Sequence, residues 1–433
     1  MDLTDVRAAA GIDDVGGWML RLIEDLYPIC RSITGDGVRE SLDILSRYMP
    51  VQVREVPTGT AVLDWTVPRE WNIRGAYVMA PDGRRVIDFA DNNLHVVGYS
   101  VPVNARMSLE ELRPHLHSLP DRPALIPFRT SFYSDAWGFC LADDVLRGLP
   151  EGEYEVCIDS SLTEGSLTYG EVVVPGRSEA EVLISAHICH PSLCNDNLSG
   201  IAVATTLARY LEHTSHKYTY RFLFAPVTIG AITWLAQNED GLHRIDHGLV
   251  LSLLGDQGGL TYKRSRRGDA VVDRAMSHVL STMSEVSVVE DFSPYGYDER
   301  QFCSPGYDLP VGCLMRTPYA RFPEYHTSGD NLQFVHAGQL EGAVATCLSL
   351  ISVLEGNDTL RNLNPKGEPQ LGRRGIYRAL ADQTEDGIEM AMLWVLNGSD
   401  GTSSLLDIAQ RAALPFAKVR AAADVLLANN LLA

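Results

Sequence analysis

Residues 182-VLISAHICHPSLCNDNLSGIAVATTLARYL-211 decide the fold of this chain. The first three, 182–184, form a short apolar run that predicts a buried strand. From Gly200 onward, apolar residues recur at helical spacing and predict a helix. His190 and Asp196 therefore fall between a strand end and a helix start, where open α/β sheets collect their ligands.

The residue types in this loop and further along the chain favour a metal site. Imidazole and carboxylate are the usual ligands of zinc-type ions. A lone histidine at a strand end is more often structural, however, and the Asn-Asp-Asn of 195–197 is also ordinary loop chemistry. Two later residues strengthen the metal interpretation: Asp256 ends the apolar run 248–256, and His326 lies in the loop-like segment 322–330.

The motif at 195-NDNLSG-200 resembles the Asp-Asp-Asn-Ala-Ser-Gly motif of co-catalytic zinc aminopeptidases, a superfamily that also holds glutaminyl cyclase. The resemblance implies that Asp196 takes the place of the metal-bridging aspartate. It also implies that His190, Asp256 and His326 are metal ligands. Ser192 stands where the family has a supporting aspartate.

A narrower resemblance covers almost the whole chain. The segments that carry it are 27–42, 93–100, 189–192, 298–301, 324–328 and 370–377. They are similar to a bacterial aminopeptidase-like family whose genes often lie beside polysaccharide or natural-product genes. The resemblance implies an α/β, zinc-aminopeptidase-like doubly wound mixed sheet with a β-rich inserted domain and a C-terminal winged helix. The expected domains are 1–55 with 166–362 (catalytic), 56–165 (inserted) and 366–433 (winged-helix-like).

One departure from the zinc aminopeptidases matters most. They carry Glu-Glu after a strand, the first as general base and the second as a ligand of a second metal. This chain has Val227 and Thr228 in those positions. The narrower family usually keeps the first glutamate, and valine cannot accept a proton. We therefore expect one Zn²⁺, with two ions as the alternative, and a general base from elsewhere.

The candidate catalytic residues come from two segments. Residues 297–302 resemble a segment that lines the substrate pocket of the zinc aminopeptidases, and 324–328 belongs to the narrower resemblance. The candidates for the missing base are Glu299, which ranks first, and then Asp298, Glu324 and His187; Arg300 completes the catalytic set. A general base must lie within hydrogen-bond reach of the attacking group, which a sequence does not show.

Composition bounds the function classes. The 433 residues are 45% hydrophobic and 21% charged, which is an ordinary globular composition, and the net charge is −20. That charge argues against nucleic acid and anionic membranes as partners. We found no run near 18 apolar residues and no signal peptide, so we expect no membrane span and a cytoplasmic location with eight free cysteines.

Outside the opening stretch, the pattern changes twice along the chain. Short β-rich runs fill 51–165, with Asp82-Gly83 as a hairpin turn and a small helix near 108–116. We expect most aromatics of this insert to be core residues, with 133–139 nearest the site. Helices near 386–397, 403–412 and 415–429 suggest the winged helix. Its third helix has two basic residues, so we favour packing or dimerisation over DNA binding, which leaves a homo-oligomer open.

Three functional hypotheses follow. The first is a zinc-dependent amidohydrolase or aminopeptidase acting on a small amino-acyl or sugar-linked biosynthetic intermediate or short peptide-like substrate. The second keeps the metal but replaces hydrolysis with acyl transfer, cyclisation or condensation in secondary metabolism, because the water-activating base is missing. The third is a non-catalytic metal-binding or scaffold protein. Fold alone does not decide among them.

Overall fold

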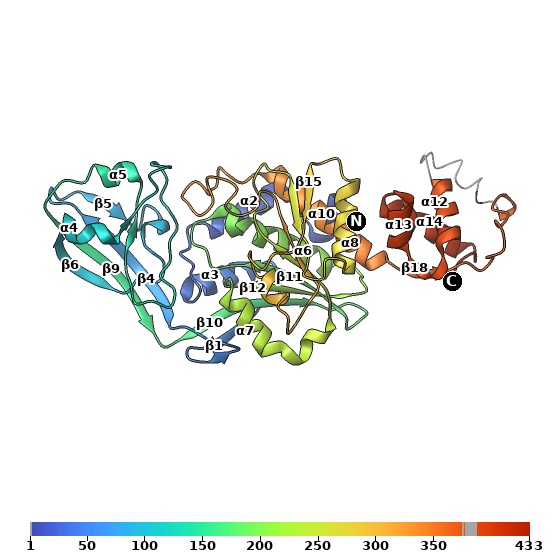
Figure 1. Cartoon of the computed structure of the whole chain (residues 1–433), viewed down its shortest axis with the longest axis horizontal. Helices are drawn as coiled ribbons and strands as arrows, with labels where there is room; N and C mark the ends of the chain where they lie inside the picture. Colours follow the sequence, from blue (N-terminus) through green and yellow to red (C-terminus); the bar gives the residue numbers. More distant parts are fainter. Residues whose placement is uncertain (1, 375, 377–387) are drawn as a thin grey trace. The chain divides into compact units, whose positions relative to one another are not determined.

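The computed structural model describes residues 2–374, 376 and 388–433 (Figure 1). The chain forms two compact units. The first holds Leu3–Gly268 and Val288–Val344, and the second holds Asp269–Ser287 and Ala345–Ala433. Each is described below by itself.

The first unit is built on an eight-stranded sheet in the order β1-β10-β12-β11-β13-β16-β14-β15. The strands are β1 (Gln52–Pro57), β10 (Ser166–Val174), β11 (Glu181–His187), β12 (Thr219–Ala225), β13 (Ile245–Leu251), β14 (Leu260–Lys263), β15 (Ser287–Glu290) and β16 (Val311–Met315). The central strands β12, β11, β13 and β16 are parallel, whereas β1, β10 and β14 join antiparallel. Every residue of β11 is buried, which explains its apolar sequence. The predicted mixed α/β sheet is therefore confirmed.

Helices cover this sheet. The helix predicted after Gly200 is α6 (Gly200–Glu212), which packs on β11 and β12 and contacts two N-terminal helices, α1 (Leu3–Ala10) and α2 (Val15–Leu26). The remaining helices of this part are α3 (Asp36–Leu45), α7 (Ile229–Asn238), η4 (Glu239–Arg244) and α9 (Glu299–Phe302). A distorted turn, η3 (Cys194–Ser199), precedes α6. It places the loop of the candidate site at the carboxyl end of β11.

The β-rich insert forms a second sheet in the order β5-β4-β9-β6, and its own apolar core packs against it. The strands are β4 (Glu70–Met79), β5 (Arg85–Asp88), β6 (Val103–Ser108) and β9 (Glu153–Thr163). Shorter elements are β2 (Ala61–Val62), β3 (Trp65–Thr66), η1 (Asn93–His95), α4 (Leu109–Leu112), η2 (Arg113–His115), β7 (Leu116–His117), β8 (Phe139–Cys140) and α5 (Asp143–Arg147). The predicted hairpin turn lies between β4 and β5, where Gly83 has φ +80°. A capping box at Ser108 starts α4.

The second unit contains the winged helix. The elements of this unit are α8 (Val271–Thr282), β17 (Thr359–Arg361), η5 (Gly372–Arg374), α12 (Ile388–Gly398), β18 (Asp400–Ser404), α13 (Leu405–Ala412) and α14 (Phe416–Ala428). All of them except α8 lie in the winged-helix segment. Three helices and the antiparallel pair β17–β18 agree with the predicted module. The start of its first predicted helix, 386–387, lies outside the described residues, as do 375 and 377 of the segment 370–377.

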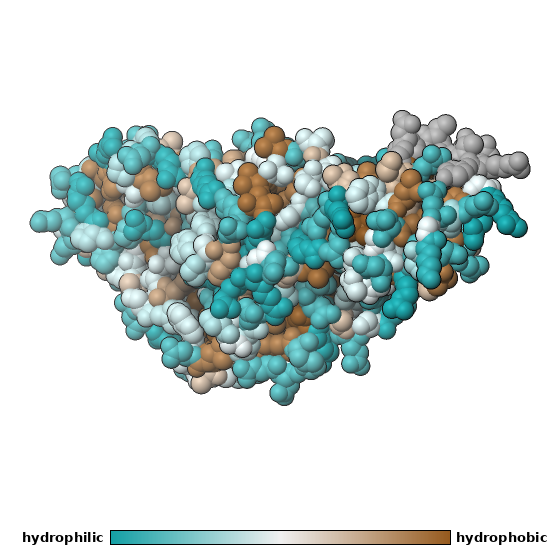
Figure 2. All heavy atoms as spheres, turned by 45° about the vertical axis from the view of Figure 1, so that its right-hand side comes forward, coloured by the Kyte–Doolittle hydropathy of each residue, from teal (hydrophilic) through white to brown (hydrophobic). Residues whose placement is uncertain are grey.

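One helix of the described residues, α10 (Ala337–Gly356), is long and apolar enough to meet the requirements of a membrane span. More than half of its most apolar window, 56%, is buried within the protein, as in the core helix of a globular protein. The face of the molecule in Figure 2 is mostly hydrophilic, with apolar residues in separate patches.

Candidate metal centre and substrate pocket

Histidine and aspartate side chains meet at the carboxyl end of β11. His187 is the last residue of that strand, and its Nε2 lies 3.0 Å from Oδ1 of Asp196 in η3. His326 approaches from a distant loop, with its Nε2 3.0 Å from Oδ2 of the same carboxylate. The ring of His190 lies 4.8 Å from that of His187 and 5.3 Å from that of His326, centroid to centroid. We call these four residues the histidine cluster.

The histidine cluster fits a zinc-type ion. His187, His190 and Asp196 each place a ligand atom within 4.8 Å of the others. His187 Nδ1 is buried without a hydrogen bond, and so is Asp196 Oδ2, whose approach to His326 lacks hydrogen-bond geometry. Buried polar atoms without partners are rare in proteins. Histidine nitrogens together with a carboxylate oxygen are usual ligands of zinc.

The charge states of the cluster suit metal binding as well. Burial lowers the pKa of His190 well below its ordinary value, so its ring is neutral and keeps a lone pair. Burial alone would raise the pKa of Asp196, but the neighbouring imidazoles of His190, His187 and His326 hold it well below the ordinary range. His190 therefore presents a neutral imidazole and Asp196 an ionised carboxylate, which are the forms that ligate metals.

Asp330 fixes the loop that carries Asp196. It is fully buried, and its carboxylate accepts hydrogen bonds from the backbone N–H groups of Asn195 (2.6 Å) and Asp196 (2.9 Å). Burial raises the pKa of Asp330 to about 8. It ties the turn η3 to the loop that holds His326. The sequence did not predict this role, because Ser-Gly-Asp at 328–330 is an ordinary loop sequence.

The structure does not bring Asp256 into the histidine cluster. Its Oδ1 accepts hydrogen bonds from Thr317 Oγ1 (2.6 Å) and the Gly258 N–H (2.7 Å). Its Oδ2 accepts one from Asn195 Nδ2 at 3.0 Å. Both oxygens are thus occupied, and Asp256 supports the loop behind Asp196. The predicted strand 248–256 also ends earlier, because β13 stops at Leu251 and leaves Asp256 in the following loop.

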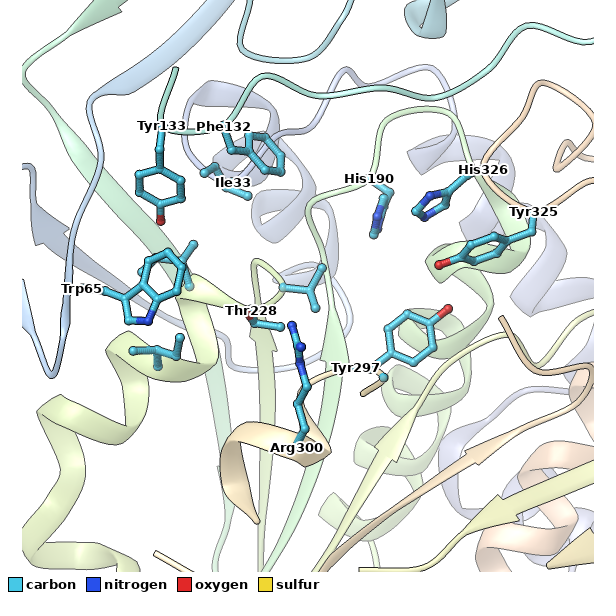
Figure 3. Close-up of a pocket in the computed structure, with 14 residues that line it drawn as sticks. Ile33, Trp65, Phe132, Tyr133, His190, Thr228, Tyr297, Arg300, Tyr325 and His326 are labelled. Carbon is cyan, nitrogen blue, oxygen red and sulfur yellow. The ribbon is translucent and has the colours of Figure 1, made fainter. Parts of the chain in front are cut away.

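A pocket of about 280 Å³ opens beside the cluster (Figure 3). His190, His326, Tyr297 and Tyr325 stand at one end, Trp65 and Tyr133 of the insert at the other, and Arg300 reaches in beside Thr228. The remaining lining residues are Ile33, Phe132, Val227, Ile229, Ile232 and Gly296. No carboxylate is among these described lining residues. Val227 thus makes the wall apolar at the position expected for a general base.

Most of the predicted catalytic residues lie away from the pocket surface. Glu299, the first-ranked base, is fully buried and forms an ion pair of 2.7 Å with the buried Lys263. Asp298 is also buried, and burial raises its pKa well above the ordinary range. Glu324 is half-buried and is not a lining residue. Arg300 lines the pocket as expected, and His187 belongs to the histidine cluster.

Two tyrosines were not predicted as functional residues. Tyr297 stacks on His187, with 5.0 Å between ring centroids, and Tyr325 stacks on His326 at 4.0 Å. Burial raises the pKa of both hydroxyls, so both stay protonated at neutral pH and remain hydrogen-bond donors. Figure 3 shows both hydroxyl groups at the end of the pocket that holds His190. Their sequence signal was that Tyr297 begins the segment 297–302, which resembles a pocket-lining segment, and that Tyr325 lies in 324–328 of the narrower resemblance.

Comparisons with known proteins place the chain in a family. The family described as "Domain of unknown function (DUF4910)" matches residues 20–357, and a winged helix-turn-helix family matches 358–433. A Clostridium acetobutylicum relative is 51% identical over 420 residues, which is 97% of this chain and 96% of the relative. Its provisional name is a polysaccharide biosynthesis protein with an aminopeptidase-like domain.

Solved structures show the same fold. A protein from Clostridium acetobutylicum, provisionally described as a peptidase, superposes with a TM-score of 0.93 at 49% identity, over 99% of this chain and 98% of that one. A zinc aminopeptidase from Bacillus subtilis superposes with a TM-score of 0.58 at 13% identity, over 79% of this chain and 94% of that one. At the latter identity the likeness is one of fold alone.

Proposed function

Because the chain belongs to the family of the domain of unknown function DUF4910 and has the zinc-aminopeptidase fold, we propose that it is a zinc-dependent, hydrolase-like enzyme. Its substrate is a small amino-acyl or sugar-linked intermediate of polysaccharide or natural-product biosynthesis, and the reacting group is an amide or ester carbonyl. The observation that carries the proposal is the convergence of His187, His190 and Asp196, with His326 against the same carboxylate.

The residues of the chain have separate roles in this reaction. His190, Asp196 and His326 would hold one zinc ion, and His187 would orient the Asp196 carboxylate through its 3.0 Å contact, so that a coordination position stays open for the substrate. Zinc, when bound, supplies Lewis-acid polarisation of a carbonyl. Tyr297 and Tyr325 donate hydrogen bonds toward an oxygen that gains negative charge, as preorganised donors do in acyl-transfer sites. The apolar wall excludes water around the reacting group.

A non-hydrolytic reaction is the second candidate. Its support is the pocket lining, which holds Val227 in place of the general base and no carboxylate among the described residues. An amine nucleophile that arrives unprotonated does not need a carboxylate to activate it, whereas water does. Acyl transfer, cyclisation or condensation in secondary metabolism would then replace hydrolysis.

The proposal extends to partners and location. The size of the pocket suits a small molecule or the end of a short peptide. The net charge of −20 disfavours nucleic acid and anionic membranes. We propose a cytoplasmic enzyme whose winged-helix module serves packing between domains or copies, so that a homo-oligomer is an expected state.

Metal content tests the proposal first. Elemental mass spectrometry of untagged protein purified without chelator should find about one zinc per chain. His190→Ala should lose the zinc, while His243→Ala, which changes an exposed histidine outside the pocket, should keep it. Wild-type protein without metal would overturn both enzyme candidates and leave a non-catalytic scaffold.

A product assay then separates the two candidates. An amino-acyl ester is offered to the zinc-loaded protein with and without hydroxylamine as an amine-type nucleophile. Hydrolysis yields the free acid in both cases, whereas transfer yields the hydroxamate and little acid when hydroxylamine is absent. His190→Ala measured beside the wild type corrects for the spontaneous reaction.

A further inference from the structure

Among the described residues, Arg300 has no hydrogen-bond or ion-pair partner, and it lines the pocket. It lies in α9, and its side chain points into the cavity beside Thr228 (Figure 3). Its Nε is buried and donates no hydrogen bond. No ion pair joins its guanidinium to a described carboxylate, and the guanidinium carbon lies 6.0 Å from the centroid of the Tyr295 ring.

Two deeply buried arginines of this unit, Arg31 and Arg316, are used differently from the half-buried Arg300. Arg31 donates hydrogen bonds to the backbone carbonyls of His190 (3.0 Å) and Leu26 (2.6 Å). Arg316 donates to the carbonyls of Leu254, Gly258 and Gln339. Both therefore serve the fold. Arg300 makes no such bond to any residue that the structure describes, so its donors can serve a molecule in the pocket.

The acidic neighbours of Arg300 do not neutralise it. Glu299 is already paired with Lys263 at 2.7 Å, so its charge is compensated behind the pocket. Asp298 is buried, and burial favours its neutral form. A positive charge thus persists in a cavity that has no acidic residue in its described lining. A partly desolvated guanidinium of this kind binds an anion more strongly than one exposed to water.

An aromatic platform faces Arg300 from the insert. Trp65 and Tyr133 are 48% and 51% exposed, which is high for such large rings. Their ring centroids lie 5.5 Å apart at an interplanar angle of 54°. Figure 3 shows them at the opposite end of the pocket from His190 and His326. The pocket thus presents a ring-binding wall, a cation and the histidine cluster.

Resting on the proposed function, we propose that the substrate carries an anionic group, a carboxylate or a phosphate, that Arg300 binds through its guanidinium. The rest of the substrate extends between the Trp65–Tyr133 platform and the histidine cluster. Arginine suits this role because its planar fork meets two oxygens of a carboxylate or phosphate at once. Arg300 is thereby the residue that selects acidic over neutral substrates.

Calorimetric titration with matched probes tests this assignment. N-acetylglycine and its neutral amide compare carboxylate with no charge, and N-acetylglucosamine 1-phosphate and N-acetylglucosamine compare phosphate with no charge. We expect one anionic probe to bind at least about tenfold more tightly than its neutral partner, because hydrogen bonds to charged groups are stronger than those between neutral groups. The pair of probes with the larger ratio of neutral-probe Kd to anionic-probe Kd identifies the preferred anion.

Variants assign the effect to Arg300. Arg300→Gln should bind both members of a pair equally, and Arg300→Lys should keep part of the preference because it keeps the charge but not the fork. Arg106→Gln, an exposed arginine on β6, should behave as the wild type. Equal binding within both pairs by the wild type, absence of binding by either anion at millimolar concentration, or an unchanged preference in Arg300→Gln would each overturn the proposal.

His190→Ala separates this inference from the proposed function. If Arg300 is the anchor, the variant should keep the anion preference after losing its zinc. A preference that disappears with the metal, while Arg300→Gln retains it, would assign the anion to the metal and overturn the role of Arg300. A protein that binds no zinc but prefers the anion through Arg300 would instead refute the enzyme proposal alone.

Discussion

At the residue scale, the candidate site depends on which side chains have partners. Glu299 and Arg300 are neighbours in the sequence, yet the glutamate forms an ion pair with Lys263, whereas the arginine points into the pocket and has no ion pair among the described residues. The resemblance of 297–302 to a pocket-lining segment ranked Glu299 first as the base, but the sequence does not show that the lysine 36 positions earlier neutralises it. For Val227, in contrast, the sequence was sufficient. A valine side chain cannot accept a proton, and the structure places this residue in the pocket wall.

Val227→Glu should add the missing general base. A carboxylate at this wall position would stand on the pocket surface, where it can take a proton from water. We expect amide hydrolysis to rise by about 10²–10⁴-fold, the usual contribution of general-base catalysis. Release of free amine from an amino-acyl amide measures it. The isosteric Val227→Thr, which carries no base, is the control, and equal rates in the two variants would contradict the assignment.

Lys263→Met should destabilise the fold strongly. Lys263 and Glu299 are 2% and 0% exposed, and removing the lysine leaves a buried carboxylate unpaired. Loss of one partner of a buried pair costs about 3–5 kcal/mol of unfolding free energy. The midpoint of denaturant unfolding reports this loss. Asp159→Asn, which breaks an exposed pair with Arg74, should cost less than about 1 kcal/mol.

At the element scale, sequence patterns predicted the strands, helices and turns whose formation depends on residues close together in the chain. The apolar run of β11, the spacing of α6 and the Asp82-Gly83 turn each depend on neighbouring residues, and each was found where the sequence placed it. The short strands β14 and β16 were missed, because four or five residues inside loops carry little periodicity. The histidine cluster was predicted only in part. His190, Asp196 and His326 meet, whereas the roles of Asp256 and Asp330 depend on hydrogen bonds between distant loops.

Strand β13 should make stability depend on pH through His247. This residue is 6% exposed, and burial lowers its pKa from 6.5 to about 4. The folded state therefore holds the ring neutral while the unfolded chain binds a proton, so the stabilisation present above pH 6.5 is lost as the pH falls toward 4. The depression corresponds to about 3 kcal/mol.

Unfolding free energies of wild type and His247→Phe, compared from pH 7 to pH 4, isolate this contribution. The variant should lose less stability over that range, because it has no proton to bind at this position. His243→Phe, on the surface, should follow the wild type. Parallel curves for the wild type and His247→Phe would show that His247 does not remain neutral in the folded protein.

At the scale of the whole molecule, the two units divide the tasks. Every residue of the histidine cluster and of the pocket belongs to the first unit, although Asp196 and His326 are 130 positions apart in the chain. A metal held by both would tie the turn η3 to the loop of 322–330. The winged helix contributes none of these residues, so metal binding and the winged helix should respond independently.

Zinc removal should therefore loosen the first unit selectively. An ion present at about a thousandfold over its Kd stabilises the protein that binds it by about 4 kcal/mol. After chelation, we expect amide hydrogen exchange to speed up in η3, at the start of α6 and in 322–330. Exchange in α13 and α14 should stay unchanged. Peptide-level mass spectrometry measures both regions in one sample, and His190→Ala should show the fast exchange without chelator. If zinc removal speeds exchange equally in the winged helix, or leaves η3 unchanged, the metal does not join these two loops.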